Sequence, residues 1–204
     1  MAQAVIDSGV KANLSRAIVN FDDSDVRRLN SFKEMVHAFE EYHGVCDGRI
    51  KIDASIHGEY TSNHLAVSAV ADYAKKNGMR AHVHISETKS EHEECKSRHG
   101  GKTPLGFFDV PTTAAHCVWI EGKDFEILRE KNVTVASNPA SNLKLASGVC
   151  NIPKLLNNNI NVAIGTDSTA SNNSLNFIEE MKIFAIAPKA YFAAPEAISP
   201  AQTL

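Results

Sequence analysis

The sequence lacks an excess of charge of either sign: 21 Lys and Arg residues face 24 Asp and Glu residues, for a formal net charge of −3 over 204 residues. It has no cluster of basic residues, so nothing in it favours attraction to nucleic acid or to an anionic membrane. It also lacks an apolar run near the roughly 18 residues that suggest a membrane span. We therefore expect neither a nucleic-acid partner nor a membrane partner.

The sequence has few cysteines, and they lie far apart. The four cysteines, Cys46, Cys95, Cys117 and Cys150, form no CxxC motif, which argues against a zinc knuckle and against a disulfide framework. Free thiols are typical of a reducing compartment. The opening segment "MAQAVIDSGVKANL" has no basic stretch followed by an apolar core, so it does not indicate a secretory signal. These absences together predict a cytoplasmic protein.

What the sequence does contain is an alternation of short strand-like runs and longer helical runs. With 43% hydrophobic residues, the chain is long enough for one substantial core. Alternating apolar positions predict strands, and apolar steps of three and four predict helices. The expected strands are 10–19, 50–56, 80–85, 112–120, 133–139 and 161–167, and the expected helices lie near 31–39, 63–78, 88–98, 123–132, 151–159 and 174–187.

Local signals mark several ends of these elements. Ser31 with Glu34, and Thr88 with Glu91, have the spacing of capping boxes, which predicts that helices begin there. Residues 22–31 read as a polar loop before the first of these helices. Gly78 is expected to end the helix that precedes it.

Six successive β/α units without a hairpin signal predict an α/β fold with a parallel sheet. Six units are two short of a closed (β/α)8 barrel. In such sheets the reactive side chains gather where strands end. We find no internal repeat and no linker, and we expect one domain over residues 1–204. The polar candidates at expected strand ends or in the loops that follow are Arg16, His57, His84, Glu87, His116 and Asp167.

The segment "RAHVHISET" offers several kinds of chemistry. Strand alternation sends His82 and His84 to one face and Val83 and Ile85 to the other. The two histidines could bind one zinc ion together. Alternatively, His84 alone is a ligand and Glu87 carries a proton, or the histidines are ordinary core residues of a strand. The residues by themselves leave these interpretations open.

Two further strand ends add to the pattern. His116 lies in "AAHCVWI", and Asp167 ends "NVAIGTD". Each has an ordinary structural explanation, because His116 could cap a strand and Asp167 could cap the following helix. Three strand ends that carry His, His and Asp are harder to attribute to packing alone.

These segments, together with "SNPASNLKLASG" and "GTDSTASNNSLNFIEEMK", make the sequence resemble the amidohydrolase superfamily. Within it, the resemblance is to the branch of 5′-methylthioadenosine/S-adenosylhomocysteine deaminases and related chlorohydrolases, and it covers nearly the whole chain. It implies part of a TIM (β/α)8 barrel of the metal-dependent hydrolase type, with the six units as barrel strands three to eight. Strands one and two, and any flanking β-sandwich domain, are then expected to be absent from these 204 residues.

The resemblance also implies roles for individual residues. His84 would be a metal ligand, Glu87 a proton carrier, and His116 a partner of the reacting water. Asp167 would complete the metal site and act in catalysis, while His82 would lie deeper as a non-ligand. The implied cofactor is one divalent metal, zinc, with iron as the alternative. The His-x-His pair that the family's first strand supplies is missing, so we expect this chain alone to be inactive and its metal site unfilled.

Three further residues match substrate-binding positions of the family. Arg16 and Arg28 match arginines near the distal or carboxylate end of the substrate, where a guanidinium can bind a carboxylate with two hydrogen bonds. Arg27 is the alternative to Arg28, and each arginine could simply be a solvated surface charge. His57 matches a histidine that holds substrate, although Gly58-Glu59 follows it where many relatives have Ser-Pro.

The function that this resemblance implies is the hydrolytic deamination of an aminopurine nucleoside, a small-molecule substrate. A guanine or triazine aminohydrolase, or a chlorohydrolase, is the alternative enzyme. An alternative of another class is a catalytically dead partial barrel that persists through self-association of its open edges. A homo-oligomer is therefore an open expectation.

Overall fold

A computed structural model describes residues 1–22, 24–101 and 109–204. Asp23, part of the expected polar loop, lies outside the described residues. The chain divides into two compact units, Met1–Val83 with Phe107–Thr112 and His84–Gly106 with Thr113–Leu204, and each is described by itself. Backbone hydrogen bonds join six strands in the order β1-β2-β3-β4-β5-β6. This confirms the α/β class with six strand-helix units; the expectation of a single domain stays a prediction.

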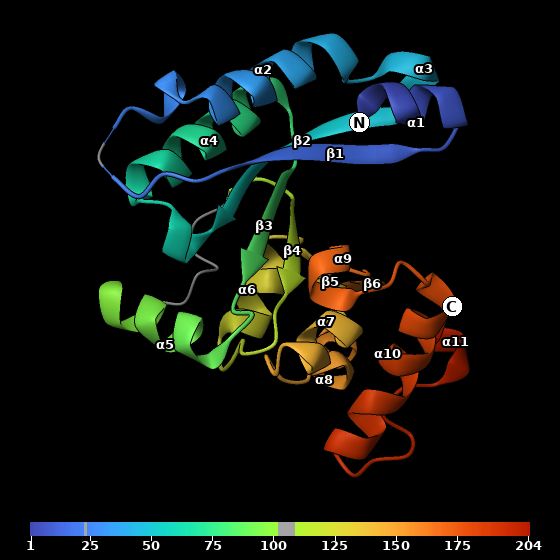
Figure 1. The fold of residues 1–204 in the computed structure, drawn as a ribbon. Helices are drawn as coiled ribbons and strands as arrows, with labels where there is room; N and C mark the ends of the chain where they lie inside the picture. Colours follow the sequence, from blue (N-terminus) through green and yellow to red (C-terminus); the bar gives the residue numbers. More distant parts are fainter. Residues whose placement is uncertain (23, 102–108) are drawn as a thin grey trace. The chain divides into compact units, whose positions relative to one another are not determined.

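The first unit carries two long strands and two long helices (Figure 1). Its elements are α1 (Ala2–Ser8), β1 (Ala12–Ile18), the 3-10 turn η1 (Val26–Arg28), α2 (Asn30–Tyr42), α3 (Val45–Gly48), β2 (Ile50–Gly58), the 3-10 turn η2 (Glu59–Thr61), α4 (His64–Asn77) and the first residues of β3 (Ala81–Ile85).

The second unit begins within β3, at His84. Its elements are α5 (Lys89–Arg98), β4 (Thr112–His116), α6 (Asp124–Glu130), β5 (Thr134–Ser137), α7 (Pro139–Lys144), α8 (Ile152–Asn157), β6 (Asn161–Ile164), α9 (Thr169–Asn172), α10 (Phe177–Tyr191) and α11 (Pro200–Thr203). Across the described parts of both units, no helix has the length and apolar character needed to cross a bilayer.

In the first unit, β1 and β2 pair in parallel from Ala12 opposite Ile50 to Ile18 opposite Ile56. Most of β2 is buried, as expected for a parallel strand with both faces covered. Helix α2 packs against both strands and α4 packs against β2 (Figure 1). Phe32 and Met35 are the buried residues of α2, so the predicted apolar face is the one that meets the core.

The start of α2 differs from the prediction. The helix begins at Asn30, with Leu29 at the cap position and no side-chain cap hydrogen bond, so the predicted Ser31/Glu34 capping box is wrong. The physical reason is that Glu34 Oε2 accepts a hydrogen bond from Arg16 Nε at 2.5 Å. Ser31 also lies inside the helix, because the helix begins one residue before it, so the Ser31 hydroxyl does not stand at the cap position. Gly78, by contrast, ends α4 with a φ of 65°, as predicted.

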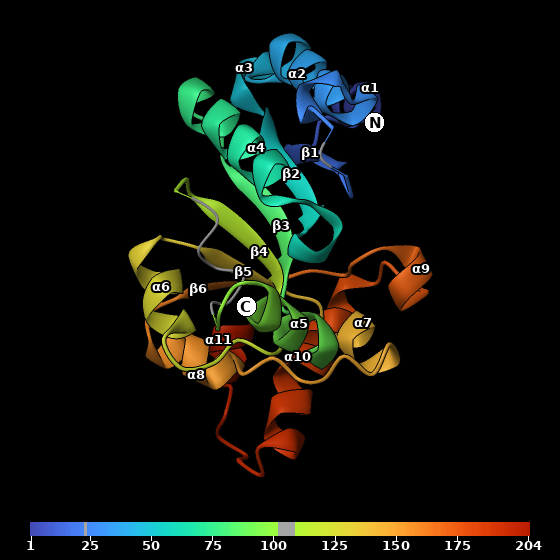
Figure 2. The ribbon, with the colours of Figure 1, turned by 90° about the vertical axis from the view of Figure 1, so that its left-hand side faces the viewer.

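In the second unit, β4, β5 and β6 follow one another as parallel strands (Figure 2). The predicted capping box at the start of α5 is confirmed, because Thr88 and Glu91 exchange hydrogen bonds with each other's backbone N–H. Strand β4 is shorter than the predicted 112–120. It ends at His116 because His116 and Cys117 have φ values of 71° and 49°, which do not continue a strand.

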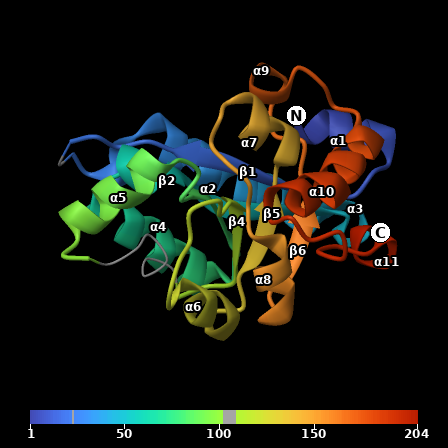
Figure 3. The ribbon, with the colours of Figure 1, turned by 90° about the horizontal axis from the view of Figure 1, so that it is seen from below.

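Helix α7 was not predicted, and it follows directly where β5 ends. Pro139 occupies its first turn, where the missing N–H of proline costs no helical hydrogen bond. The helix packs against both α9 and α10 (Figure 3). It therefore presents its side chains beside the end of the sheet.

Candidate functional site

The end of β3 shows the predicted alternation. Ala81, Val83 and Ile85 are buried, whereas His82 and His84 are partly exposed. His82 belongs to the first unit, where its carbonyl accepts a hydrogen bond of 2.8 Å from Ser55 Oγ. His84 belongs to the second unit. The interpretation of His82 as a non-ligand stays a prediction.

Four of the predicted site residues come together within the second unit. The rings of His84 and His116 stack with centroids 5.4 Å apart and planes at 28°. Glu87 Oε2 lies 3.7 Å from His116 Nε2. Both histidines lie close enough to Asp167 to lower the pKa of its carboxyl group. The side chains that end β3, β4 and β6 thus converge as parallel strand ends should, while their chemical roles stay predictions.

His116 is almost fully buried, with 1% of its surface exposed. Its Nδ1 lies 2.8 Å from Asn142 Oδ1, so the N–H at this nitrogen donates to the amide oxygen. The amide of Asn138 lies farther from the same nitrogen, at 3.4 Å. In neutral imidazole the proton on Nδ1 leaves a lone pair on Nε2, the nitrogen that faces Glu87. The contact with Asn142 thus leaves Nε2 as the nitrogen that faces Glu87, and the role of His116 stays a prediction.

Asp167 is held as an ionised carboxylate. Burial raises the pKa of Asp167, but hydrogen bonds from Ser141 Oγ at 2.6 Å and from the Ser168 N–H at 2.7 Å lower it, as do the two histidines. The net result is a pKa below the ordinary value. A deprotonated carboxylate is the form that binds metals and accepts protons.

Glu87 follows β3 in a tightly held turn. Its side chain is 18% exposed, and its Oε1 accepts a hydrogen bond of 3.4 Å from Ser147 Oγ. The buried carboxylate of Glu91 accepts from the Ser86 N–H at 3.1 Å and from the Glu87 N–H at 2.9 Å. Burial raises the pKa of Glu91 overall, although these N–H groups lower it. The backbone of the turn is thus held by Glu91, while the Glu87 carboxylate faces Ser147 and His116, and its role as a proton carrier stays a prediction.

Of the eleven positive-φ residues other than glycine among the described residues, four lie at this place. Ser86, His116, Cys117 and Asp167 all have positive φ values, of 48°, 71°, 49° and 59°. A residue other than glycine in this region costs about 1–3 kcal/mol and persists only where its surroundings hold it firmly. Such residues cluster at functional sites, and here they stand at the ends of three strands.

Helix α7 and its neighbours support the site, and sequence reasoning missed them. Glu180 on α10 is buried, and its carboxylate accepts from the Ala140 N–H at 3.2 Å and from the side chain of Asn172. It thereby ties the start of α7, which carries Ser141 and Asn142, to α9. The polar stretch "SNPASNLKLASG" at a strand end was the signal that could have identified these residues.

The three predicted substrate-binding residues belong to the first unit. Arg16 on β1 is paired with Glu34, and its side chain is half exposed. Arg28 is exposed at the end of η1. His57 lies near the end of β2, with Nδ1 3.2 Å from Thr61 Oγ1 and its ring edge-on to Tyr60. Their roles in binding stay predictions.

The donor set fits part of a metal site. Imidazole and carboxylate are both zinc ligands, and the carboxylate of Asp167 carries the supporting hydrogen bonds that metal ligands commonly have. Within the described part of the second unit, no three His, Cys, Asp or Glu side chains place their ligand atoms within 4.8 Å of one another. The assignment of His84 and Asp167 as two ligands of a divalent metal stays a prediction.

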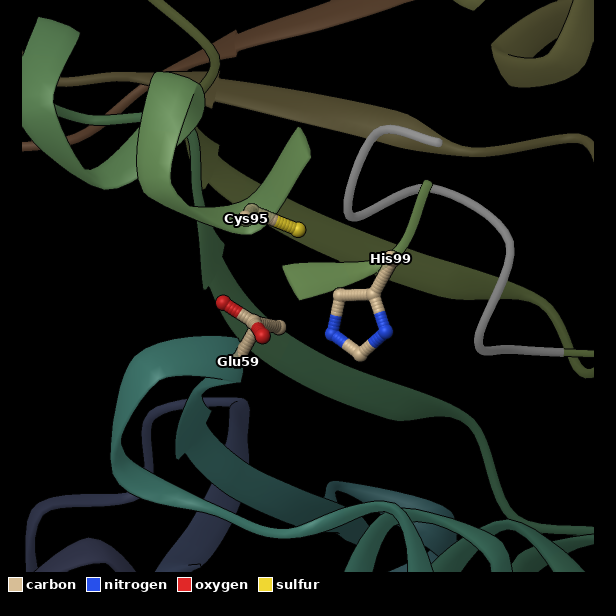
Figure 4. A group of neighbouring side chains, drawn as sticks. All are labelled: Glu59, Cys95 and His99. Atoms are coloured by element: carbon tan, nitrogen blue, oxygen red, sulfur yellow. The ribbon is translucent and has the colours of Figure 1, made fainter. Parts of the chain in front are cut away.

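Three further residues with ligand chemistry, Glu59, Cys95 and His99, are shown in Figure 4. Glu59 belongs to the first unit, and Cys95 and His99 belong to the second. These residues thus belong to different compact units, and no joint site is assigned to them.

The chain is similar to known proteins of one family along its length. The sequence model of the amidohydrolase family matches residues 1–204. The chain is 41% identical over 196 residues to a 5-methylthioadenosine/S-adenosylhomocysteine deaminase of Caldanaerobacter subterraneus subsp. tengcongensis, which covers 93% of this chain and 45% of the relative. It is 35% identical over 204 residues to a 5′-deoxyadenosine deaminase of Methanothermobacter thermautotrophicus, with 97% of this chain and 47% of the relative covered.

Among solved structures, the fold matches an adenosine deaminase from Xanthomonas campestris with bound zinc. The TM-score is 0.88 at 29% identity, over 99% of this chain and 47% of the other. The chain therefore spans about half the length of the relatives it matches. Its fold is that of a partial barrel, as the prediction of six β/α units had it.

Proposed function

Because the chain belongs to the amidohydrolase family, we propose that the protein catalyses the hydrolytic deamination of an adenosine-type nucleoside. The favoured substrates are 5′-methylthioadenosine and S-adenosylhomocysteine, after the names of its relatives. The observation that carries the proposal is the convergence of His84, Glu87, His116 and Asp167 at the strand ends of one unit. In the reaction, water adds to the ring carbon that bears the amino group, and ammonia leaves as the C–N bond breaks.

His84 and Asp167 would hold a divalent metal, with zinc favoured. When bound, such an ion lowers the pKa of its water to about 7 and so supplies a nucleophile at neutral pH. Asp167 has a second task, to accept the proton that the water loses. Its hydrogen bonds from Ser141 and Ser168 keep it ionised and fix its orientation for this task.

Glu87 and His116 would manage the charge that develops on the substrate. Glu87 donates a proton to the ring nitrogen beside the reacting carbon, takes up the proton of the hydroxyl group that the attacking water leaves on that carbon, and passes it to the departing ammonia. The proton that Asp167 took from the water then returns Glu87 to its protonated form. His116 turns Nε2 towards the same space, because Asn142 engages Nδ1. Through Nε2 it can accept a hydrogen bond from the attacking water and, once protonated, stabilise the negative charge that follows.

The number of metal ligands that this chain offers limits the activity expected of it alone. Zinc sites in enzymes use three protein ligands and a water molecule, whereas the second unit offers His84 and Asp167. The relatives are about twice as long as this chain. We infer that catalysis needs further ligands that the additional length of such relatives provides, and that the 204-residue chain alone turns over poorly.

The test is ammonia release by the protein that carries this chain, measured on adenosine-type nucleosides, guanine and a chlorotriazine. We expect the nucleosides to be preferred, and Asp167→Asn to lower kcat by about 10²–10⁴-fold, the range for loss of a proton-transfer group. Asp72→Asn, at an exposed position of α4, is the matched control. Turnover of guanine alone, or chloride release from the triazine alone, would instead support the alternative enzymes. A metal-poor oligomer without turnover would support the non-catalytic partial barrel.

A further inference from the structure

A buried chain of polar side chains leads from the turn before Glu87 to the protein surface. Ser86 Oγ lies 2.9 Å from His92 Nδ1, and His92 Nε2 lies 3.5 Å from Glu121 Oε1. The same Glu121 oxygen accepts a 2.6 Å hydrogen bond from Lys96 Nζ. All of these residues lie in the second unit. We call Ser86, His92 and Glu121 the His92 relay.

The relay has the residue types of a serine hydrolase triad but cannot act as one. Ser86 has 0% of its surface exposed and His92 has 2%, so no substrate can reach the Ser86 hydroxyl. The order of contacts is also reversed, because a triad serine faces Nε2 of its histidine and the acid faces Nδ1. With its serine and histidine buried and only Glu121 at the surface, the relay can hold the Ser86 side chain in place but cannot act on a substrate.

The group that it holds is the residue directly before Glu87. Ser86 has a φ of 48°, a conformation that costs free energy in any residue other than glycine. Its N–H donates to Glu91, and its carbonyl accepts from the Trp119 N–H at 3.0 Å. The contact with His92 is what fixes its side chain. Ser86 is thus held at three points in a conformation that it would otherwise leave.

Loss of the histidine would release one of these points. The Ser86 hydroxyl would remain buried without its imidazole partner, and a buried polar group without a partner is unfavourable. Relaxation of Ser86 out of its strained φ would remove that cost, but it would also rotate the peptide that leads into Glu87. The carboxylate of Glu87, which lies 3.7 Å from His116 Nε2, would then move away from that position.

We propose that His92 is a positioning residue for Glu87, acting through the side chain of Ser86. The proposal rests on the proposed function in one respect, the role of Glu87 as proton carrier. The arrangement of the turn itself does not depend on that role. The two claims can therefore be tested separately.

Two substitutions separate the ends of the relay. In His92→Asn the short amide can take the place of Nδ1 and keep the contact with Ser86. In His92→Gln the longer amide reaches the place of Nε2, towards Glu121, and leaves Ser86 without its partner. Ser86→Ala removes the contact from the other side and serves as a second variant should His92→Gln fold poorly.

The first measurement is hydrogen exchange of the Ser86 and Glu87 amides in the 204-residue chain. His92→Gln and Ser86→Ala are expected to lower protection at both amides by about tenfold, the fold-change for the loss of one buried hydrogen bond. His92→Asn should retain it. Unchanged protection in His92→Gln, or equal loss in His92→Asn and His92→Gln, would overturn the proposal, because only packing would then connect His92 to the turn.

The second measurement is steady-state deamination by the protein that carries this chain. His92→Gln should lower kcat by about tenfold with KM unchanged, because the relay touches no substrate. In His92→Asn, kcat should stay near that of the unsubstituted protein. A rise in KM at constant kcat would contradict the positioning role. Absence of turnover in the unsubstituted protein would refute the proposed function, while the exchange experiment would still decide whether His92 holds the turn.

Discussion

Gly165 is glycine because Asn138 fills the space where a side chain would stand. A Cβ on residue 165 would overlap Asn138 Oδ1 and lie 3.4 Å from Asn138 Cγ. Asn138 is only 5% exposed, and its amide lies 3.4 Å from His116 Nδ1, so it cannot swing into solvent. Gly165→Ala is therefore expected to destabilise the chain by about 1–3 kcal/mol, the range for an overfilled core.

A double-mutant cycle tests whether this steric conflict is the cause. Asn138→Ala alone should cost about 1–2 kcal/mol through its lost contacts. In Gly165→Ala/Asn138→Ala the conflicting group is gone, so the double variant should be about as stable as Asn138→Ala. The coupling free energy between the two substitutions would then be nearly as large as the destabilisation by Gly165→Ala alone.

Urea unfolding of the four proteins gives the coupling free energy directly, provided that the dependence on denaturant stays the same. Gly122→Ala is a useful comparison, because its Cβ would meet open space while its φ of 49° is strained. That cost should not depend on Asn138. Additive effects of Gly165→Ala and Asn138→Ala, within about 0.5 kcal/mol, would refute the steric explanation.

Two further predictions concern buried carboxylates. Burial raises the pKa of Asp53, although Arg80, Asn13 and His43 lower it, so the folded-state pKa lies above the unfolded value near 3.8. The stability that this group contributes is present below the unfolded pKa and is lost as pH rises through the folded pKa. Asp53→Asn should therefore gain stability relative to the unsubstituted chain between about pH 3 and pH 7, measured by urea unfolding across that range; a difference that does not change with pH would contradict this. Glu180→Leu should lower the free energy of unfolding by about 1–3 kcal/mol, because the Ala140 N–H loses its acceptor. Glu179→Leu, on the exposed face of α10, is the control and should cost little when both variants are unfolded by heating. Equal losses in the two variants would show that helix propensity, and not the buried carboxylate, decides the effect.

The sequence predicted most of the framework because the framework depends on local patterns. Alternation at β3, the Thr88/Glu91 capping box and the helix end at Gly78 are all confirmed. Each depends on side chains a few residues apart, so it can be recognised in the sequence without knowledge of tertiary contacts. The six parallel strands follow from the order of these elements.

The failures have tertiary causes. Ser31 and Glu34 have the spacing of a capping box, but the helix begins at Asn30 and the Glu34 carboxylate accepts a hydrogen bond from Arg16, which lies 18 residues away in sequence. The predicted strand 112–120 stops at His116 because the backbone there turns to a positive φ, which apolar residues beyond it do not reveal.

The candidate site divides in the same way. The groups at strand ends, His84, Glu87, His116 and Asp167, could be found because parallel strands bring their ends together. The groups that orient them could not. Asn142 reaches His116 from 26 residues away and Ser147 reaches Glu87 from 60 residues away. Only the packing of α7 and its following loop brings these partners into contact.

The central claim is that Glu87 moves protons beside a metal held in part by His84 and Asp167. It is tested most directly by ammonia release from 5′-methylthioadenosine by Glu87→Gln, compared with the unsubstituted protein at equal metal content. The account predicts a loss of kcat of about 10²–10⁴-fold with the bound metal retained, because Glu87 is a proton carrier and not a ligand. Undiminished turnover, or loss of the metal together with activity, would contradict it.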